Sequence, residues 1–132
     1  MTFSFPVTVY YEDTDAGGVV YHSNYLNYCE RARTELLRSL GVTQRTLLEE
    51  NIGFVVRHAD ISYLTGAKLD DQLIVQTSIN NLKKASMVFC QNIVNSDGKR
   101  LCQAKVKVAC VSMHTNESSE QIMKPVAIPE DI

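Results

Sequence analysis

Residues 10–40 of the chain, YYEDTDAGGVVYHSNYLNYCERARTELLRSL, decide the fold. From Ser23 to Leu40 no glycine or proline intervenes, and Gly41 stands just past the end as a stop signal. Ser23 or Asn24 can cap the start. The pattern predicts a long helix over residues 23–40.

This helix has a wide apolar face. Arg31 and Glu35 lie on the remaining stripe, where their i, i+4 spacing favours an ion pair. Because so much apolar surface needs a cover, we expect a sheet to wrap the helix. The apolar positions are Tyr25, Leu26, Tyr28, Cys29, Ala32, Leu36, Leu37 and Leu40.

Strand patterns flank the helix on both sides. Phe5–Tyr11 is rich in Val, Tyr and Phe and is typical of a strand that enters a loop. A shorter second helix is expected over Thr43–Glu50, with Thr43 as its cap and Gly53 beyond its end. After Gly53 the period becomes two, which predicts antiparallel strands at 53–65, 72–82, 85–95 and 100–113.

The last of these strands has the clearest alternation, and Asp97-Gly98 before it is a strong hairpin signal. Its polar face carries Gln103, Lys105 and Lys107, and its apolar face carries Cys102, Ala104, Val106, Val108 and Cys110. One early helix followed by a meander of strands predicts a single α+β domain over residues 1–132, with one sheet curled around the helix. The polar tail from about residue 116 is expected to be loosely ordered.

Composition narrows the function classes. The net charge of −2 and the pI of about 5.9 provide no global basic field for nucleic acid or anionic lipid. No segment approaches the roughly 20 apolar residues that span a bilayer, and no leader pattern is present, so we expect a cytoplasmic protein. The cysteines lack CxxC spacing and lie among apolar residues, which favours reduced, packed thiols over disulfides or zinc.

The loop before the helix concentrates groups that can do acid/base chemistry. Three acidic residues fall within four positions, and paired glycines, His22 and a helix N-terminus follow. Backbone N–H groups without intrahelical partners at such a terminus could stabilise an oxyanion. The alternative is structural: Asp13 and Asp15 shape a turn, Gly17 and Gly18 serve its dihedral angles, and His22 lies at the surface.

Residues 11–37, YEDTDAGGVVYHSNYLNYCERARTELL, resemble the signature of the bacterial acyl-CoA thioesterases associated with the Tol–Pal cell-envelope system, a branch of the 4-hydroxybenzoyl-CoA thioesterase family. The resemblance extends more weakly to about Met113. It implies a hot-dog fold, in which a five-stranded antiparallel sheet wraps the long helix, and a dimer or tetramer with its sites between subunits. It also implies that Asp15 is the catalytic aspartate and that the helix entry near Tyr21 and His22 polarises the thioester carbonyl.

These assignments suggest how a thioester would be hydrolysed. Asp15 would attack the carbonyl or deprotonate water, and the N–H groups of Tyr21, His22 and Ser23 would receive the developing charge. Gly17 and Gly18 would let the acyl group approach the backbone, or would simply form the turn. His22 would orient Asp15 or the thioester, or have a structural hydrogen bond, and Asp13 is expected to cap the loop.

The phosphates of coenzyme A need cations. Candidate residues are Arg57, Lys83, Lys84, Lys99 and Arg100, with the Lys83-Lys84 pair preferred, although solvated charges at strand ends are the common alternative. The His and Cys residues show no metal-ligand spacing, so we expect no metal and no cofactor besides the coenzyme A of the substrate.

Two other functions stay open. One is an enoyl-thioester hydratase of the same fold. The other is a non-catalytic module that binds acyl-CoA or a partner from the envelope or phospholipid-synthesis machinery. A complete acidic loop favours hydrolysis over both.

Overall fold

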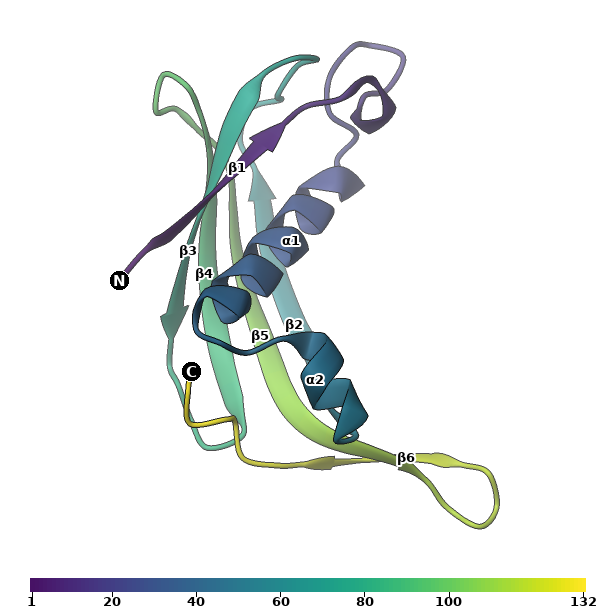
Figure 1. Cartoon of the computed structure of the whole chain (residues 1–132). Helices are drawn as coiled ribbons and strands as arrows, with labels where there is room; N and C mark the ends of the chain where they lie inside the picture. The colour runs from purple at the N-terminus through teal and green to yellow at the C-terminus, as the bar shows by residue number, and fades with distance from the viewer.

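The computed structural model describes residues 1–132 and shows a long helix lying across one face of an antiparallel sheet (Figure 1). This confirms the predicted α+β hot-dog architecture. The helices are α1 (Ser23–Ser39) and α2 (Gln44–Glu49), and the strands are β1 (Phe3–Thr8), β2 (Ile52–Tyr63), β3 (Gln72–Asn80), β4 (Ser86–Asn95), β5 (Arg100–Thr115) and β6 (Gln121–Pro125). Neither helix has the length and apolar character needed to cross a membrane.

The core lies between α1 and the facing side of the sheet. The buried side of α1 consists of Tyr25, Tyr28, Cys29, Ala32, Leu36 and Leu37, as its apolar periodicity predicts. The inward residues of the strands meet it, among them Leu73, Phe89 and Val106. The predicted alternation of β5 is also confirmed, because Cys102 to Cys110 are buried at every second position while Lys105 and Lys107 are exposed.

The two ends of α1 differ in how they are closed. Gly41 adopts a φ of +85°, and the N–H groups of Gly41 and Val42 donate to the carbonyls of Arg38 and Leu37, which is a Schellman ending. At the start, the expectation that Ser23 or Asn24 caps the helix is wrong. His22 is the cap residue, and its side chain makes no capping hydrogen bond. The side-chain amide of Asn24 donates to the Asp13 carbonyl and does not cap the helix.

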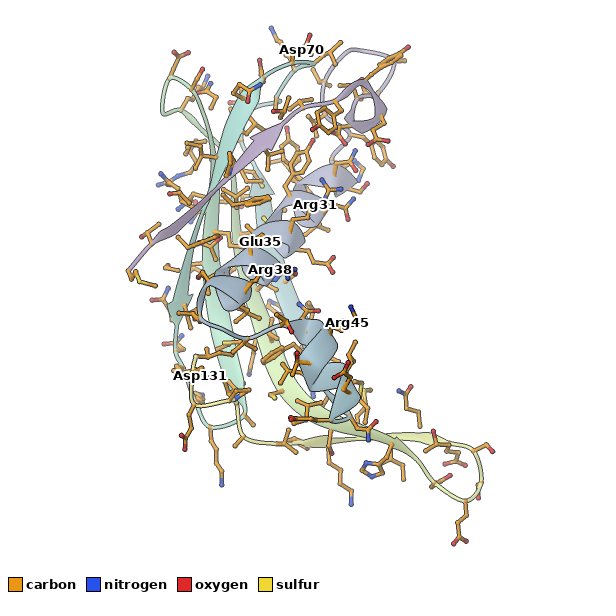
Figure 2. The ribbon with its side chains drawn as sticks, in the orientation of Figure 1. Arg31, Glu35, Arg38, Arg45, Asp70 and Asp131 are labelled. Carbon is orange, nitrogen blue, oxygen red and sulfur yellow. The ribbon has the colours of Figure 1, made fainter.

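The predicted ion pair on the exposed side of α1 is also different. Glu35 pairs with Arg38 at 3.3 Å, one turn further on, rather than with Arg31. The Arg31 guanidinium instead lies 5.9 Å from the centre of the Tyr28 ring, so its side chain is directed towards the helix start. Figure 2 shows all three charged side chains along the same side of α1.

The order of strands departs from a simple meander. β3, β4 and β5 follow one another, but the order across the sheet is β1-β3-β4-β5-β2, so β2 pairs with β5 and not with β3. A period of two identifies strands but not their neighbours, because pairing depends on where α1 and α2 deliver the chain. As a result β2 is a long strand at the open edge, and residues 57–60 on it are exposed.

The C-terminal tail corrects two expectations. Residues 121–125 form β6, which pairs with the end of β5, so the sheet has six strands rather than five and the tail is not loosely ordered throughout. The N–H of Val126 donates to Cys110, and that of Ile128 donates to Lys84. These backbone bonds hold the tail against the sheet despite its polar composition.

Gly53 lies beyond the end of the second helix, as predicted, but it does not make the turn that follows the helix. Asn51, with a φ of 60°, makes the turn after α2, and Gly53 lies within β2. A Cβ atom at Gly53 would lie only 2.6 Å from Cε of Met113, so a larger residue there would make the flexible Met113 side chain move. The Thr43 cap is confirmed, because its hydroxyl accepts the Thr46 N–H at 3.3 Å.

Candidate active site

The acidic loop is a tight hairpin between β1 and α1. Thr14 and Val20 form an antiparallel bridge, and the Asp15 N–H donates to the Val19 carbonyl at 2.9 Å. The Gly18 N–H donates back to the Asp15 carbonyl, and Gly18 adopts a φ of +77°. Only glycine adopts this left-handed conformation without strain, so the turn requires Gly18.

Gly17 holds the Asp15 carboxylate. Its N–H donates to Oδ1 of Asp15 at 2.9 Å, and a Cβ atom at position 17 would lie 3.3 Å from that same oxygen. The second oxygen, Oδ2, has no partner in the chain, and the side chain is exposed. The carboxylate is therefore fixed in direction while one oxygen stays available to accept a proton.

The loop is anchored on the chain that joins β2 to β3. Val19 bridges to Lys68, and the Val20 N–H donates to the Ala67 carbonyl at 2.9 Å. The Ala67 N–H in turn donates to the Tyr25 hydroxyl at 2.9 Å, inside the core. Asp15 is therefore positioned by α1 and by the 66–69 segment together.

Asp13 is a buried structural residue, as its loop-capping prediction implies. Its carboxylate accepts the Tyr10 N–H at 2.9 Å, and its carbonyl accepts the Tyr21 N–H and the Asn24 side chain. The nearby Tyr28 hydroxyl is buried, and burial, followed by the neighbouring Asp13 carboxylate, raises its pKa. Because the Tyr21 N–H donates to the Asp13 carbonyl, it is not free to bind a substrate oxygen.

Two donors remain free at the start of α1. The N–H groups of His22 and Ser23 have no partner in the chain, whereas the Asn24 N–H donates to Tyr21. These two groups lie at the positive end of a 17-residue helix, where an anionic oxygen is favoured. Free donors of the kind that an oxyanion site needs are therefore present at His22 and Ser23, but not at Tyr21.

The His22 imidazole makes no hydrogen bond to Asp15 or to any other residue of the chain. Its ring lies 4.6 Å from the Tyr21 ring and 5.9 Å from the Tyr63 ring, edge to face with the latter. Tyr63 is the last residue of β2, and the centre of its ring lies 5.7 Å from the centre of the buried Tyr25 ring. Tyr63 could not be singled out from the sequence, because an aromatic residue at the end of a strand usually serves packing alone.

The predicted cationic residues divide between the two ends of the sheet. Lys83 and Lys84 lie in the β3–β4 turn, whereas the acidic loop lies at the Leu73 end of β3, roughly 27 Å away along the strand. Figure 2 labels Asp70 at the loop end and Asp131 towards the opposite end. Arg57 lies at a bulge in the middle of β2 and lines a surface cavity with His58 and Lys107.

Lys99 and Arg100 lie at the same end as the acidic loop, because the Asn95 end of β4 pairs with the Leu73 end of β3. Lys68 is nearer still, since it forms a bridge with Val19. The sequence reasoning missed Lys68, because a lone lysine between two strands carries no distinguishing pattern. Within one chain, these three cations are closer in the fold to Asp15 than Lys83 and Lys84 are.

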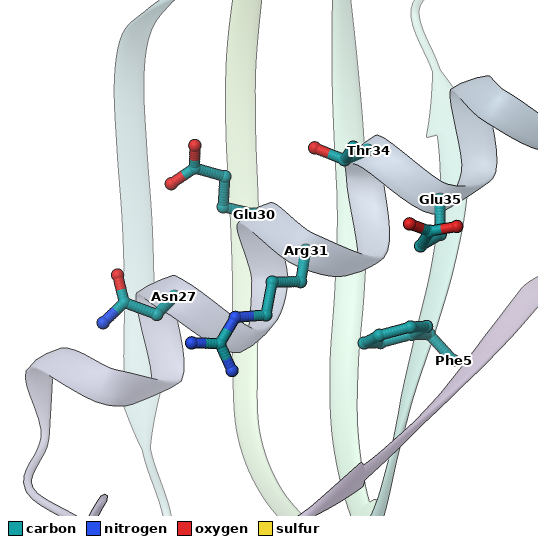
Figure 3. Close-up of a pocket in the computed structure, with 6 residues that line it drawn as sticks. All are labelled: Phe5, Asn27, Glu30, Arg31, Thr34 and Glu35. Atoms are coloured by element: carbon teal, nitrogen blue, oxygen red, sulfur yellow. The ribbon is translucent and has the colours of Figure 1, made fainter. Parts of the chain in front are cut away.

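No described cavity contains Asp15. A groove of about 420 Å³ runs between the outer side of α1 and β1, where Phe5 is the one apolar residue among Asn27, Glu30, Arg31, Thr34 and Glu35 (Figure 3). Two carboxylates and mainly polar walls suit neither an acyl chain nor phosphates. The surroundings of Asp15 in one chain are therefore an open surface.

Comparisons with known proteins agree with this geometry. A family model described as thioesterase-like superfamily matches residues 9–132. The acyl-CoA thioesterase YbgC of Haemophilus influenzae is 52% identical over 98% of this chain and 90% of its own length. The crystal structure of a probable thioesterase from Bartonella henselae, 35% identical, superposes with a TM-score of 0.79 over 95% of this chain and all of that chain.

A more distant structure supports the fold alone. The 1,4-dihydroxy-2-naphthoyl-CoA thioesterase of Synechocystis has a TM-score of 0.86 at 22% identity, covering 99% of this chain and 92% of that one. The one-helix, curled-sheet architecture is thus shared over the whole length.

Proposed function

This chain belongs to the thioesterase-like superfamily, and we propose that it hydrolyses acyl-coenzyme A thioesters with Asp15 as the central catalytic group. That the chain is a thioester hydrolase follows from the Haemophilus relative, which is similar over almost the entire length. The role of Asp15 is our own assignment. It depends on one observation: the carboxylate held by Gly17 belongs to the loop that leads directly to two unpaired N–H groups at the start of α1.

In the proposed reaction, Asp15 takes a proton from water while the water oxygen attacks the thioester carbonyl carbon. The carbonyl oxygen becomes an oxyanion that accepts hydrogen bonds from the His22 and Ser23 N–H groups. Collapse of the tetrahedral intermediate breaks the carbon–sulfur bond, and the coenzyme A thiolate leaves and is protonated. One such donor typically contributes about 3 kcal/mol to the transition state. No cofactor besides the coenzyme A of the substrate is needed.

Replacement of Asp15 tests this role. Asp15→Asn keeps the size and the hydrogen bond from Gly17 but removes the basic charge, so kcat should collapse while substrate binding largely survives. Retention of more than about a tenth of kcat, a loss below 1.4 kcal/mol, would remove Asp15 from the mechanism. Free-thiol release from saturated acyl-CoA provides the assay, and it also excludes a hydratase, which cannot hydrolyse that substrate.

Whether Asp15 activates water or attacks the carbonyl itself is tested by isotope labelling. With enzyme in excess in oxygen-18 water, attack by water labels the carboxylate product in the first turnover. An Asp15 anhydride opened at the aspartyl carbonyl would instead deliver an unlabelled oxygen. We expect labelled product, and unlabelled first-turnover product would overturn the general-base route.

We propose further that a second copy of the chain completes the site. β2 leaves an open edge of twelve residues, and edge pairing between two copies would cover it. The exposure of Asp15 in one chain supports the same proposal. For the coenzyme A phosphates we favour Lys68, Lys99 and Arg100, which lie at the Asp15 end of the same chain, whereas Arg57 and the Lys83-Lys84 pair would contribute from the second copy.

The cellular setting is also a proposal. Four free cysteines, three of them buried, favour a reducing compartment, so we place the enzyme in the cytoplasm. The resemblance of the 11–37 stretch to Tol–Pal-associated thioesterases suggests partners in the cell envelope or in phospholipid synthesis. A non-catalytic binding role would require that the wild-type protein releases no thiol from any acyl-CoA ester that it binds.

A further inference from the structure

Two neighbouring cavities lie between the helices and the β2 side of the sheet. The near chamber, about 150 Å³ under α1, has five apolar lining residues, among them Leu37, Phe54 and Phe89, and its polar lining residues are Glu30, Arg33 and Gln44. The far chamber, about 230 Å³ under α2, has apolar walls that include Leu47, Leu48, Ile52 and Met113. Phe54 and Gln44 line both chambers, so each chamber is in contact with these two side chains.

The lining of the two chambers suits a hydrocarbon chain. An acyl-CoA hydrolase must hold the acyl group of its substrate away from water, and apolar burial supplies the affinity. The groove of Figure 3 has one apolar lining residue, whereas each of the two chambers has five. They provide the apolar space that the surface around Asp15 lacks.

We propose that the near chamber receives the acyl chain of the substrate, and that Phe54, together with Gln44, sets the chain-length preference by closing the far chamber. This assignment rests on the proposed hydrolysis at Asp15. It adds a residue that determines specificity and a class of substrate: straight-chain acyl groups whose length is limited by Phe54.

The chamber that serves a given Asp15 belongs to the second copy. Within one chain, Arg33 at the near chamber follows His22 by eleven residues of helix, about 16 Å, which a short acyl chain cannot span. Symmetric antiparallel pairing of two β2 edges would place Ile52 of the partner subunit opposite Tyr63, which contacts His22. Phe54 of the partner subunit would then lie two residues, about 7 Å, along the strand from this point.

The volumes of the two chambers predict the acyl-chain length at which Phe54 and Gln44 limit binding. At about 30 Å³ for each water-sized group, the near chamber holds about five methylene groups, and the far chamber adds about eight more. Each methylene that gains burial improves binding about fourfold. Chains that fill the near chamber should therefore be preferred, and longer chains should gain nothing while Phe54 is in place.

The experiment measures kcat/KM of the full-length protein for saturated acyl-CoA esters from acetyl to dodecanoyl, by thiol release. Phe54→Ala joins the chambers and should raise the dodecanoyl-to-hexanoyl ratio of kcat/KM by about tenfold or more, since several methylenes gain burial. Phe5→Ala is the matched control. Phe5 is likewise half-buried and packs on the same core, but it lies on β1, at the opposite edge of the sheet.

Each outcome decides a different claim. A raised ratio in Phe54→Ala but not in Phe5→Ala supports the role proposed for Phe54. An unchanged ratio in a Phe54→Ala enzyme that still hydrolyses hexanoyl-CoA overturns it and leaves the proposed function standing. A wild-type protein that hydrolyses no acyl-CoA refutes the proposed function, and the role of Phe54 with it. If Phe54→Ala fails to fold, Phe54→Leu keeps more of the packing and should shift the ratio in the same direction by less, and a flat response there is equally decisive.

Discussion

The Gly17 N–H is the one contact that orients the Asp15 carboxylate, and the space at Gly17 is limited by that carboxylate. Gly17→Ala would place a methyl group 3.3 Å from Oδ1, so either the carboxylate or the loop must shift by a few tenths of an ångström. Because catalysis depends on position, we expect kcat to fall about tenfold or more, a loss of at least 1.4 kcal/mol. The free energy of unfolding should change by less than about 1 kcal/mol, since the site is exposed.

Gly98→Ala provides the contrast for this prediction. Gly98 has a φ of +79° in the β4–β5 turn, where alanine costs about 1–2 kcal/mol of backbone strain without touching the site. Urea unfolding and thiol-release kinetics on both variants should therefore show opposite patterns. If Gly17→Ala retained full kcat, the hydrogen bond to Asp15 would have no catalytic role.

Cys29 links stability to pH. It is fully buried on the inner side of α1, and burial raises its pKa to about 12 from an ordinary value near 9. In the unfolded chain the thiol ionises near pH 9, so the stabilising contribution is complete below pH 9 and is lost as pH rises towards 12. One such thiol contributes about 1.4 kcal/mol per pH unit across that window.

Cys29→Ala isolates this contribution from other groups that ionise at alkaline pH. Between pH 9 and 11, the free energy of unfolding should fall less steeply in the variant than in the wild type, and the two slopes should differ by about 1.4 kcal/mol per pH unit. Equilibrium denaturation at several pH values measures the difference. Parallel slopes in the two proteins would mean that the Cys29 thiol ionises normally in the folded state.

At the scale of elements, a buried polar network joins α1 to the sheet. The side-chain amide of Gln91 on β4 donates to the Cys29 carbonyl at 2.9 Å and to the Thr77 hydroxyl at 3.0 Å. Its oxygen accepts a hydrogen bond from Arg33 at 3.0 Å, and burial lowers the pKa of that guanidinium. These hydrogen bonds therefore fix the rotation of α1 about its own axis as well as its contact with the sheet.

Gln91→Leu should test the strength of this network. The substitution leaves the buried Thr77 hydroxyl and the Arg33 guanidinium with fewer partners, which costs about 1–3 kcal/mol of unfolding free energy. Gln103→Leu, on the exposed face of β5, is the control and should stay within about 0.5 kcal/mol of wild type. Equal denaturation midpoints for the two variants would show that the network contributes nothing.

The elements also show what the sequence could and could not determine. The bounds of α1 and the burial pattern of β5 were predictable, because they depend on periods of 3.6 and two within one segment. The position of β2 beside β5, the β6 pairing and the Glu35–Arg38 ion pair were not, because they depend on which segments meet. The same holds in the site: the acidic loop was found from local residues, whereas Lys68, Tyr63 and the occupied Tyr21 N–H required the fold.

At the scale of the whole molecule, the open β2 edge and the length of α1 between His22 and the near chamber both favour the proposed second copy. Sedimentation should therefore detect a dimer or tetramer, and a strictly monomeric protein with full activity would contradict the shared site. Oligomerisation alone does not show that the site is shared, however. Two inactive variants provide a stronger test.

The first variant is Asp15→Asn, which lacks the base but keeps the near chamber. The second is Val56→Trp, which fills the near chamber but keeps Asp15; Val56 is 56% exposed, so the larger side chain should be tolerated in the folded chain. After joint unfolding and refolding, half of the dimers should be mixed, and each mixed dimer should have one site with both an intact Asp15 and an open chamber. Thiol release from hexanoyl-CoA should then recover to about a quarter of the wild-type rate, while each variant alone stays inactive. Recovery would fail if both groups came from the same chain, because no mixed dimer would then contain an intact site; a mass spectrum showing mixed dimers without activity would therefore refute the shared site.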